Sequence, residues 1–279
     1  MISPRRLLPA ERRRQIAKLV EELGALRISD VAARFGVADE TVRRDLLSLE
    51  RQGLLTREHG GASLAGVDAE TPYRRRERSQ AAAKRLIAQA AARFVRDGST
   101  IILDSGTTTH HMVEFLRSKR DLVVITNGIS HVADLLANPT TSVVVAGGAV
   151  RRASLGTAGD MAVATLEKLH ADRCFLATHS FSADTGVTYP HLEEATVKRA
   201  MIAAAAEVTL LADGSKYGRT SMVQVASLNE LQRVITSEPI AEEAVARLRL
   251  AGIEVLVVDK GQAEESRELE EEDAWRGQI

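Results

Sequence analysis

A loop rich in glycine and hydroxyl groups lies between a short apolar run and a helix-forming run in the segment "ILDSGTTTHHMVEFL", residues 102–116. Backbone N–H groups at a helix N-terminus, together with hydroxyl groups, can bind an anion, and phosphate is the expected ligand. The loop is neither a G-x-G-x-x-G motif nor a P-loop with its lysine, so a dinucleotide or ATP is disfavoured. A simple capped turn is the alternative for this segment taken alone. The candidate ligands are Ser105, Gly106, Thr107, Thr108 and Thr109.

Polar residues and glycines also follow other apolar runs further along the chain. Ligands of open α/β sheets bind at the carboxyl ends of the strands, so these residues would converge on one edge of a parallel sheet. Each residue alone could be structural, but together they describe a polar crevice that suits a phosphorylated ligand. The candidates are Thr126, Asn127, Gly147, Gly148, Asp213 and Lys216, with Lys198 as a further cation on a predicted helix.

A second candidate site lies in "DETVRRDLLSLERQ", residues 39–52. Val42, Leu46 and Leu49 repeat as one buried face of a helix, which leaves Arg43 and Arg44 on the polar sides. An arginine can bind guanine or a phosphate, and two short helices followed by a hairpin are typical of a winged helix-turn-helix. The alternative is a solvated pair of arginines with Asp39, Glu40 or Asp45 as local partners. The expected DNA contacts are Ser29, Thr41, Arg43, Arg44, Ser48, Arg57 and His59.

These residues need two different scaffolds to position them. Residues 1–62 are predicted as a DNA-binding domain with helices over 11–23, 29–35 and 39–52 and a hairpin over 54–64. Ser29 and Asp39 are candidate helix caps. Residues 63–80 are predicted as a linker that could carry a docked segment. From residue 81 to 261, apolar strands alternate with helices, which indicates a parallel sheet covered on both faces. These strands are expected within 99–104, 122–126, 141–148, 172–177, 207–213, 233–237 and 253–258. Residues 262–279 form an acidic tail.

Composition excludes several other classes of protein. The 279 residues are 44% hydrophobic and 27% charged, without an apolar run long enough for a membrane span or a secretory signal, so we expect a cytoplasmic protein. A single cysteine, Cys174, excludes an internal disulfide and a multi-cysteine zinc site. Residues 1–78 carry 16 Lys and Arg against 12 Asp and Glu, whereas the rest has a net charge of −5. The basic front end suits a polyanionic partner.

The front segment resembles the N-terminal signature of the DeoR family of bacterial transcriptional regulators. The resemblance runs without gaps over residues 11–62, and "TVRRDLLSLERQGLL" followed by "HGGA" carries it most specifically. Ala38 is a departure, because the family often has a capping serine there. Asp39 is expected to take over as the cap and to shift the helix start by one residue.

The second half resembles the sensor domain of the same family over about residues 74–258, through "DSGTTT", "TNGI", "GVTYPHLEEATVKRAM" and "DGSKYG". That resemblance implies a Rossmann-like fold similar to ribose-5-phosphate isomerase. It implies that residues 104–109, including Asp104, grip phosphate, and that Lys198, Asp213 and Lys216 line the sugar end. Gly214 and Ser180, which follows His179, depart from the family pattern and leave the identity of the sugar open.

The expected function is a DNA-binding repressor of carbohydrate metabolism genes, controlled by a phosphorylated sugar and acting as a homo-oligomer. No metal, cofactor or catalytic residue is expected, because no H-E-x-x-H motif or nucleophile triad is present. One alternative is a sugar-phosphate isomerase-like enzyme with an accessory DNA-binding domain. Its candidate acids would be Glu193, Glu194 and Asp213. The other alternative is a protein that binds nucleic acid without sequence preference.

Overall fold

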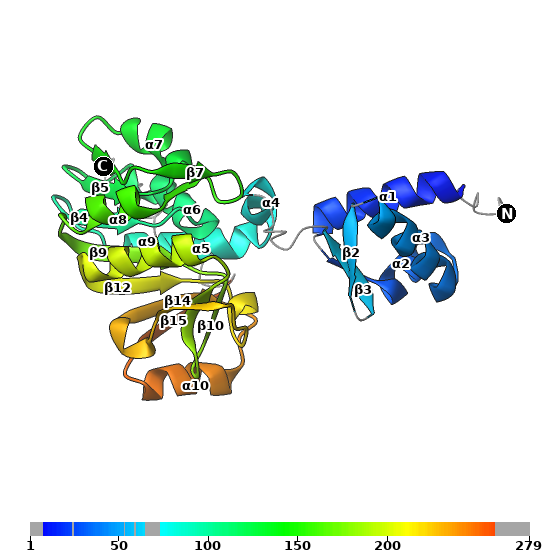
Figure 1. The fold of residues 1–279 in the computed structure, drawn as a ribbon. Helices are drawn as coiled ribbons and strands as arrows, with labels where there is room; N and C mark the ends of the chain where they lie inside the picture. Colours follow the sequence, from blue (N-terminus) through cyan, green and yellow to red (C-terminus); the bar gives the residue numbers. More distant parts are fainter. Residues whose placement is uncertain (1–7, 24, 53, 59, 65–72, 260–279) are drawn as a thin grey trace, which may run out of the picture. The chain divides into compact units, whose positions relative to one another are not determined.

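The computed structural model describes residues 8–23, 25–52, 54–58, 60–64 and 73–259. The chain divides into two compact units, residues 1–71 and residues 72–279, and each unit has a hydrophobic core of its own (Figure 1). Within the described ranges, no helix is both long and apolar enough to cross a membrane.

The first unit contains the three helices and the hairpin that the sequence predicts. Ile16, Val20, Val42, Leu46 and Leu49 are buried together in its core, so the predicted apolar stripe of the third helix packs inward. One short strand was not predicted, and it pairs antiparallel with the second strand of the hairpin. The elements are α1 (Pro9–Leu23), β1 (Ala25–Arg27), α2 (Ile28–Phe35), α3 (Asp39–Arg51), β2 (Leu55–Glu58) and β3 (Gly61–Leu64).

The two predicted helix caps are wrong. Helix α2 begins at Ile28 with Arg27 as its N-cap, so Ser29 lies inside the first turn, where its hydroxyl donates to Asp30 Oδ1 at 3.2 Å. Helix α3 has Ala38 as its N-cap and no capping side chain. Asp39 is therefore the first helical residue, where its negative charge favours the positive end of the helix dipole.

The second unit is built on a seven-stranded sheet in the order β15-β14-β12-β9-β4-β5-β6. All neighbouring strands are parallel, which confirms the predicted parallel sheet. The strands are β4 (Thr100–Leu103), β5 (Val123–Thr126), β6 (Ser142–Val145), β9 (Ala171–Ala177), β12 (Ala205–Leu211), β14 (Arg233–Ser237) and β15 (Glu254–Val258).

Helices cover both faces of this sheet (Figure 1). Ile101 and Leu103 of β4 belong to one buried cluster, whereas Ile102, between them, belongs to the other. Because successive side chains of a strand point to opposite faces, strands buried on both sides read as continuous apolar runs. The helices are α5 (Ala81–Ala92), α6 (Thr107–Leu116), α7 (Ile129–Leu136), α8 (Asp160–Leu166), α9 (Leu192–Ala203) and α10 (Glu242–Leu250).

Some elements of the second unit differ from the prediction. The predicted linker of residues 63–80 includes the end of β3 and the whole of α4 (Tyr73–Arg78), and α4 belongs to the second unit. Five short strands were also missed: β7 (Ala149–Arg151) pairs with β8 (Gly156–Ala158), and β10 (Ser180–Ser182), β11 (Gly186–Tyr189) and β13 (Val223–Ala226) form an antiparallel sheet. The predicted acidic tail lies outside the described residues.

Candidate functional site

The strand order of the large sheet places a topological switch point between the ends of β4 and β9. The chain adds β5 and β6 on one side of β4, and it then returns to place β9 and β12 on the other side. At such a switch point the connections leave in opposite directions, and ligands bind outside the carboxyl ends of the two strands. Asp104 follows β4 here and Thr178 follows β9.

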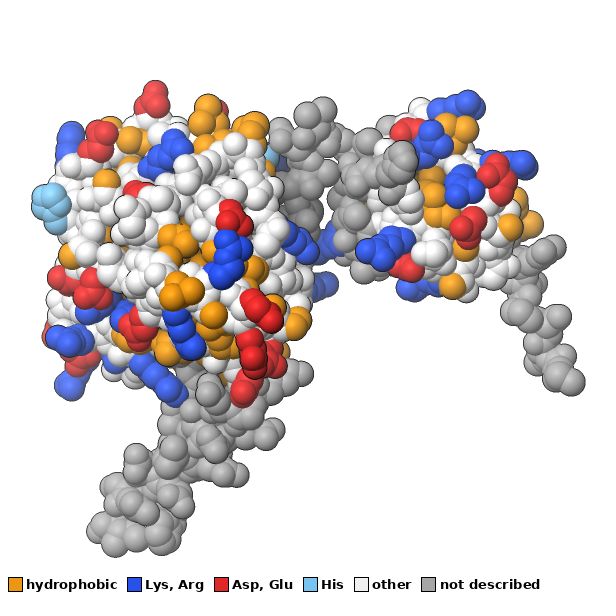
Figure 2. Space-filling view, turned by 90° about the horizontal axis from the view of Figure 1, so that it is seen from below, with side chains coloured by type: hydrophobic (Ala, Val, Ile, Leu, Met, Phe, Trp, Pro, Cys, Tyr) orange, Lys and Arg blue, Asp and Glu red, His pale blue; other side chains and the backbone are white. Residues whose placement is uncertain are grey.

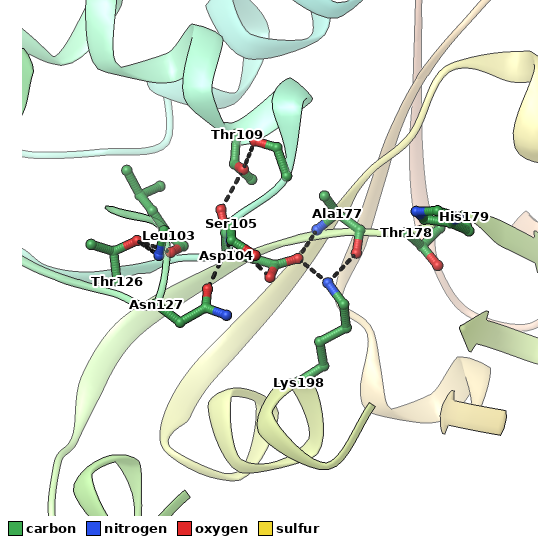
Figure 3. A network of polar contacts seen from close by, with 12 residues as sticks. Leu103, Asp104, Ser105, Thr109, Thr126, Asn127, Ala177, Thr178, His179 and Lys198 are labelled. Carbon is green, nitrogen blue, oxygen red and sulfur yellow. Dashed lines mark hydrogen bonds and ion pairs between the residues drawn. The ribbon is translucent and has the colours of Figure 1, made fainter. Parts of the chain in front are cut away.

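Asp104 holds this switch point together (Figure 3). Its side chain is fully buried, Oδ1 accepts the Ser105 N–H at 2.9 Å, and Oδ2 accepts the Ala177 N–H at 2.9 Å. Oδ2 also forms an ion pair with the buried Lys198 ammonium, which donates in addition to Ala177 O at 3.0 Å. The expectation that Asp104 grips phosphate is therefore wrong in its geometry, because both carboxylate oxygens bind the protein itself. Lys198 is likewise engaged with Asp104.

The polar residues after β5 support the loop of residues 105–109. Thr126 donates to Leu103 O at 2.6 Å. Asn127 Oδ1 accepts the Ser105 N–H at 2.8 Å, and its amide nitrogen donates to Thr157 O at 3.1 Å. Both side chains are buried. Thr126 and Asn127 therefore position the loop of residues 105–109. Their polar atoms bind the protein itself.

The first turn of α6 begins with amides that take no part in the hydrogen bonds of the helix itself. The first intrahelical bond runs from His110 N–H to Gly106 O at 3.0 Å, so the amides of Thr107, Thr108 and Thr109 precede it. Gly106 is the N-cap and has no side chain with which to cap them. A side chain at position 106 would also collide with Ala177. The loop therefore fits an anion site, although the Thr109 hydroxyl is bound to Gly106 O at 2.7 Å.

The two glycines after β6 have different surroundings. Gly148 has a φ of +122°, and a Cβ there would lie 2.6 Å from Ala158 O. The close approach predicted for this glycine is thus to β8 of the protein. Gly147 has no heavy atom within 4 Å of such a Cβ, so no described contact requires a glycine there.

Charged groups from several elements of the second unit act on one another electrostatically. Asp213 is buried and accepts the Ser215 N–H at 3.1 Å, and Lys216 follows it in a short 3₁₀ turn. Burial lowers the pKa of Lys216, and the nearby Asp213 acts in the opposite direction. The sequence interpretation missed Lys84, which is buried and whose pKa burial lowers to about 8.

The sequence interpretation also missed Arg76 and His179. Arg76 donates to Ala153 O at 2.9 Å and lies 3.1 Å from His179 Nε2, and burial, followed by the charge of Arg76, holds the pKa of His179 well below its usual value. The basic run "YRRRERSQ", which contains Arg76, belongs to the predicted linker with its docked segment, whereas Lys84 lies at the start of the predicted sensor domain, and neither pattern by itself indicates a site residue.

In the first unit, the outer face of α3 exposes its arginine pair. The side chains of Arg43 and Arg44 are 55% and 79% exposed, and they lie 3.6 and 3.5 Å from Glu40. The two arginines are therefore exposed, as predicted, and Glu40 is also present as the local partner that the alternative interpretation expects. Thr41 is half-buried near the start of the same helix. Such exposed arginines can bind DNA, since a surface ion pair at this distance holds them only weakly.

Other predicted DNA contacts are engaged or lie elsewhere. The half-buried Ser48 hydroxyl accepts hydrogen bonds from Arg13 at 2.6 Å and from Gln52 at 3.3 Å, and its contact with DNA stays a prediction. Arg57 on β2 is partly exposed and forms an ion pair with Glu50 at 2.8 Å. His59 lies outside the described residues. On the surface seen in Figure 2, basic side chains are interspersed with acidic ones.

Two family models match the two units. The model of the DeoR-like helix-turn-helix domain matches residues 12–66, and the model of the DeoR C terminal sensor domain matches residues 79–238. Among solved structures, ribose 5-phosphate isomerase A from Methanocaldococcus jannaschii is 17% identical and aligns over 50% of this chain and 55% of its own with a TM-score of 0.37. No functional conclusion follows at that level of similarity.

Three curated relatives are similar over most of the chain. The putative aga operon transcriptional repressor of Escherichia coli O157:H7 is 32% identical over 89% of this chain and 94% of its own. The HTH-type transcriptional regulator GlpR of Haloferax volcanii is 34% identical, with coverages of 90% and 98%. The glycerol-3-phosphate regulon repressor of Escherichia coli K12 is 30% identical, with coverages of 82% and 91%.

Proposed function

Since this chain belongs to the DeoR family of transcriptional regulators, we propose that it represses genes of carbohydrate metabolism and that a phosphorylated sugar or a related metabolite controls its binding to operator DNA. The first unit binds the operator through α3, and the second unit binds the metabolite at the switch point between β4 and β9. Regulation requires that the metabolite prefer one arrangement of the chain over another.

The observation that carries the metabolite assignment is the loop of residues 105–109. It offers the amides of the first turn of α6, at the positive end of a helix dipole, at the switch point where sheets of this kind bind ligands. A relative named as the glycerol-3-phosphate regulon repressor supports a phosphorylated ligand. Asp104, Asn127 and Lys198 then act as supports of this loop.

The small size of the first unit bears on the oligomeric state. A single winged helix-turn-helix contacts few base pairs, so tight specific binding needs at least two copies on a two-fold symmetric site. We therefore expect a homo-oligomer. We also expect it to act in the cytoplasm, where operator DNA is found.

Operator binding is tested by fluorescence anisotropy with DNA from upstream of the gene for this protein and with random DNA of equal length at moderate salt. We expect the upstream DNA to bind at least about 1,000-fold more tightly, as specific sites do. Equal affinity for both DNAs would show that the protein binds nucleic acid without sequence preference, and it would refute the proposed function as a regulator.

The metabolite is tested by thermal denaturation with a panel of phosphorylated sugars and the same sugars without phosphate. A ligand that binds only the native state raises the melting temperature by mass action, so a shift with phosphorylated members alone is expected. The same panel is assayed for aldose–ketose turnover. Steady conversion would favour the isomerase-like enzyme, for which the buried Glu194, 3.1 Å from Arg151, is a candidate acid.

A further inference from the structure

The large sheet of the second unit ends on one side in β6, a strand that the protein covers only in part. It pairs with β5, and within the described residues no other strand pairs with it. Ser142 and Val145 are exposed, and Val143 and Val144 are half-buried. In β4 and in β5, by contrast, three of the four residues are buried. Strand β6 therefore leaves an apolar edge of the sheet open.

The backbone of β6 also has hydrogen-bonding groups that point away from β5. The Ser142 amide donates at 2.8 Å to the residue just before β5, and the Ala146 amide donates at 2.9 Å to the last residue of β5. Successive residues of a strand direct their N–H and C=O groups to opposite sides. The N–H and C=O groups of Val143 and Val145 therefore point to the open edge, where such groups are a template for another strand.

Exposed apolar side chains lie around this edge. Eight large apolar side chains are exposed in the described part of the second unit, and five of them belong to β6, to β7, which follows it, and to the helices α7 and α8. These five are Ile129, Leu136, Val145, Val150 and Met161. Helix α7 contacts β6, and Gly148, just after β6, lies close to Ala162 of α8. Exposed apolar side chains gathered on neighbouring elements mark a protein–protein interface.

The same edge carries almost no charge. Residues 135–150, from the end of α7 to β7, contain no Asp, Glu, Lys, Arg or His. At the other end of the unit (Figure 1), β15 begins with Glu254, which pairs with Arg233 at 2.5 Å, and four of the nine residues of its neighbour α10 are charged. A charged edge repels a copy of itself, whereas a neutral apolar edge is complementary to its own copy. The charge pattern therefore favours a second copy of this chain as the partner of β6.

We propose that β6 pairs antiparallel with β6 of a second copy of this chain across a two-fold axis, so that the two seven-stranded sheets join at this edge. A two-fold axis brings identical surfaces together, and two copies of one strand then run in opposite directions. The inference rests on the proposed function only for the need of two copies, and it names the surface through which they meet.

The free backbone groups of β6 determine the register of this pair. The register that satisfies both Val143 and Val145 places Val143 of one copy opposite Val145 of the other, and each such pair exchanges two hydrogen bonds. Val144 then lies on the two-fold axis, opposite its own counterpart. In such a pair, which is not hydrogen-bonded, the two Cα atoms are about 4.5 Å apart.

The first test places a cysteine on the axis in the full-length chain. A disulfide spans the Cα distance expected at position 144, so Val144→Cys should give a covalent dimer on a non-reducing gel after mild oxidation. The native Cys174 is buried, so the wild type should stay uncross-linked. Leu250→Cys, 88% exposed on α10, is the control and should not cross-link. Val145→Cys should not cross-link either, because its counterpart lies about 7 Å further along the strand.

The second test measures self-association of the full-length chain by sedimentation equilibrium. Val145→Lys places a charge in the interface twice, so the Kd of self-association is expected to rise at least about 30-fold. Leu250→Lys adds the same charge away from β6 and should change this Kd less than about twofold. Circular dichroism of Val145→Lys should match that of the wild type, because the Val145 side chain is already 38% exposed.

Three results would overturn the interface. One is a wild type that is monomeric at the concentrations at which it binds operator DNA. Another is cross-linking of Val144→Cys no greater than that of Leu250→Cys. The third is self-association of Val145→Lys within about twofold of the wild type.

Failure of the proposed function has a different signature. In that case the wild type still assembles and Val144→Cys still cross-links, but the protein prefers neither the upstream DNA nor any phosphorylated sugar. Specific operator binding by a protein whose assembly both substitutions leave unchanged refutes only the role of β6.

Discussion

At the scale of single residues, the pair of Asp104 and Lys198 shows how a polar residue near a ligand site can serve the protein itself. Both side chains are buried, and together they bind backbone atoms on either side of the switch point. An unpaired charge in such a place is unfavourable, because water cannot solvate it. The pair therefore fixes the shape of the loop of residues 105–109, which we propose as the anion site.

Asp104→Ala is expected to lower the free energy of unfolding of the second unit by about 3 to 5 kcal/mol, because it leaves Lys198 buried without its partner. Chemical denaturation measures this loss. Asp104→Asn combined with Lys198→Met removes both charges and should recover part of the stability. Equal losses in the single and double variants would contradict a coupled pair. Operator affinity should stay as in the wild type, since Asp104 lies outside the first unit.

Arg44→Ala is expected to weaken operator binding by about 10- to 100-fold, the usual effect of losing one base-reading arginine, while the fold is retained. Fluorescence anisotropy with operator and random DNA measures it. Arg120→Ala is the matched control, because the Arg120 side chain is 78% exposed and lies 3.5 Å from Asp97, as Arg44 is 79% exposed and lies 3.5 Å from Glu40. An unchanged operator affinity for Arg44→Ala would mean that this arginine is only solvated.

At the scale of elements, α1 holds helix α3 through polar as well as apolar contacts. Arg12 forms a buried ion pair with Asp45 at 2.6 Å, and Arg13 donates to Ser48 at 2.6 Å. Both acceptors lie on α3, so one turn of α1 fixes the rotation of that helix about its axis. This rotation decides which side chains of α3 remain exposed.

Asp45→Ala is expected to destabilise the first unit by about 3 to 5 kcal/mol, because Arg12 then remains buried without its carboxylate. Circular dichroism melting should show an early transition, while the second unit melts as before. Asp30→Ala is the control, since Asp30 lies exposed on α2. A single, unshifted transition would show that the pair does not hold α3.

At the scale of the whole molecule, buried histidines of the second unit couple stability to pH. Burial, with a smaller effect of His110, lowers the pKa of His131 to about 3, and burial likewise lowers the pKa of His111 and His179. In the unfolded chain histidine titrates near about 6.5. The unfolded state therefore binds more protons below that pH, and stability is lost as pH falls from there towards the folded pKa.

The free energy of unfolding of the second unit is expected to fall by about 1.4 kcal/mol per pH unit below about pH 6 through His131, whose pKa in the folded chain is about 3, and His111 and His179 act in the same direction. Urea denaturation at pH 7, 6 and 5 measures the slope. His131 Nδ1 lies 3.3 Å from Gly128 O, and the amide of His131→Asn can replace this ring N–H. The variant should reduce the dependence of the unfolding free energy on pH by up to the contribution of one histidine. His170→Asn, at an exposed position, should leave it unchanged. An identical slope in His131→Asn would contradict the assignment.

Much of the fold was predictable because its signals are local. The seven central strands are apolar runs, since Ile101, Ile102 and Leu103 are buried on alternating faces. Helix α4 was not predictable, because its six residues "YRRRER" contain one apolar anchor, Tyr73. That anchor packs only because residues such as His110, 37 positions away, meet it in the folded chain.

The sequence by itself determined the two units, their longer helices, the seven central strands and the loop of residues 105–109, because periodicity, glycines and helix termini act over a few residues. Only the tertiary structure decided which polar groups remain available for a ligand. Asp104 and Lys198 are 94 positions apart, and Arg76 and His179 are 103 apart, yet each pair meets at the switch point. Partners so distant in the chain leave no local pattern, since their contact depends on the order of the strands.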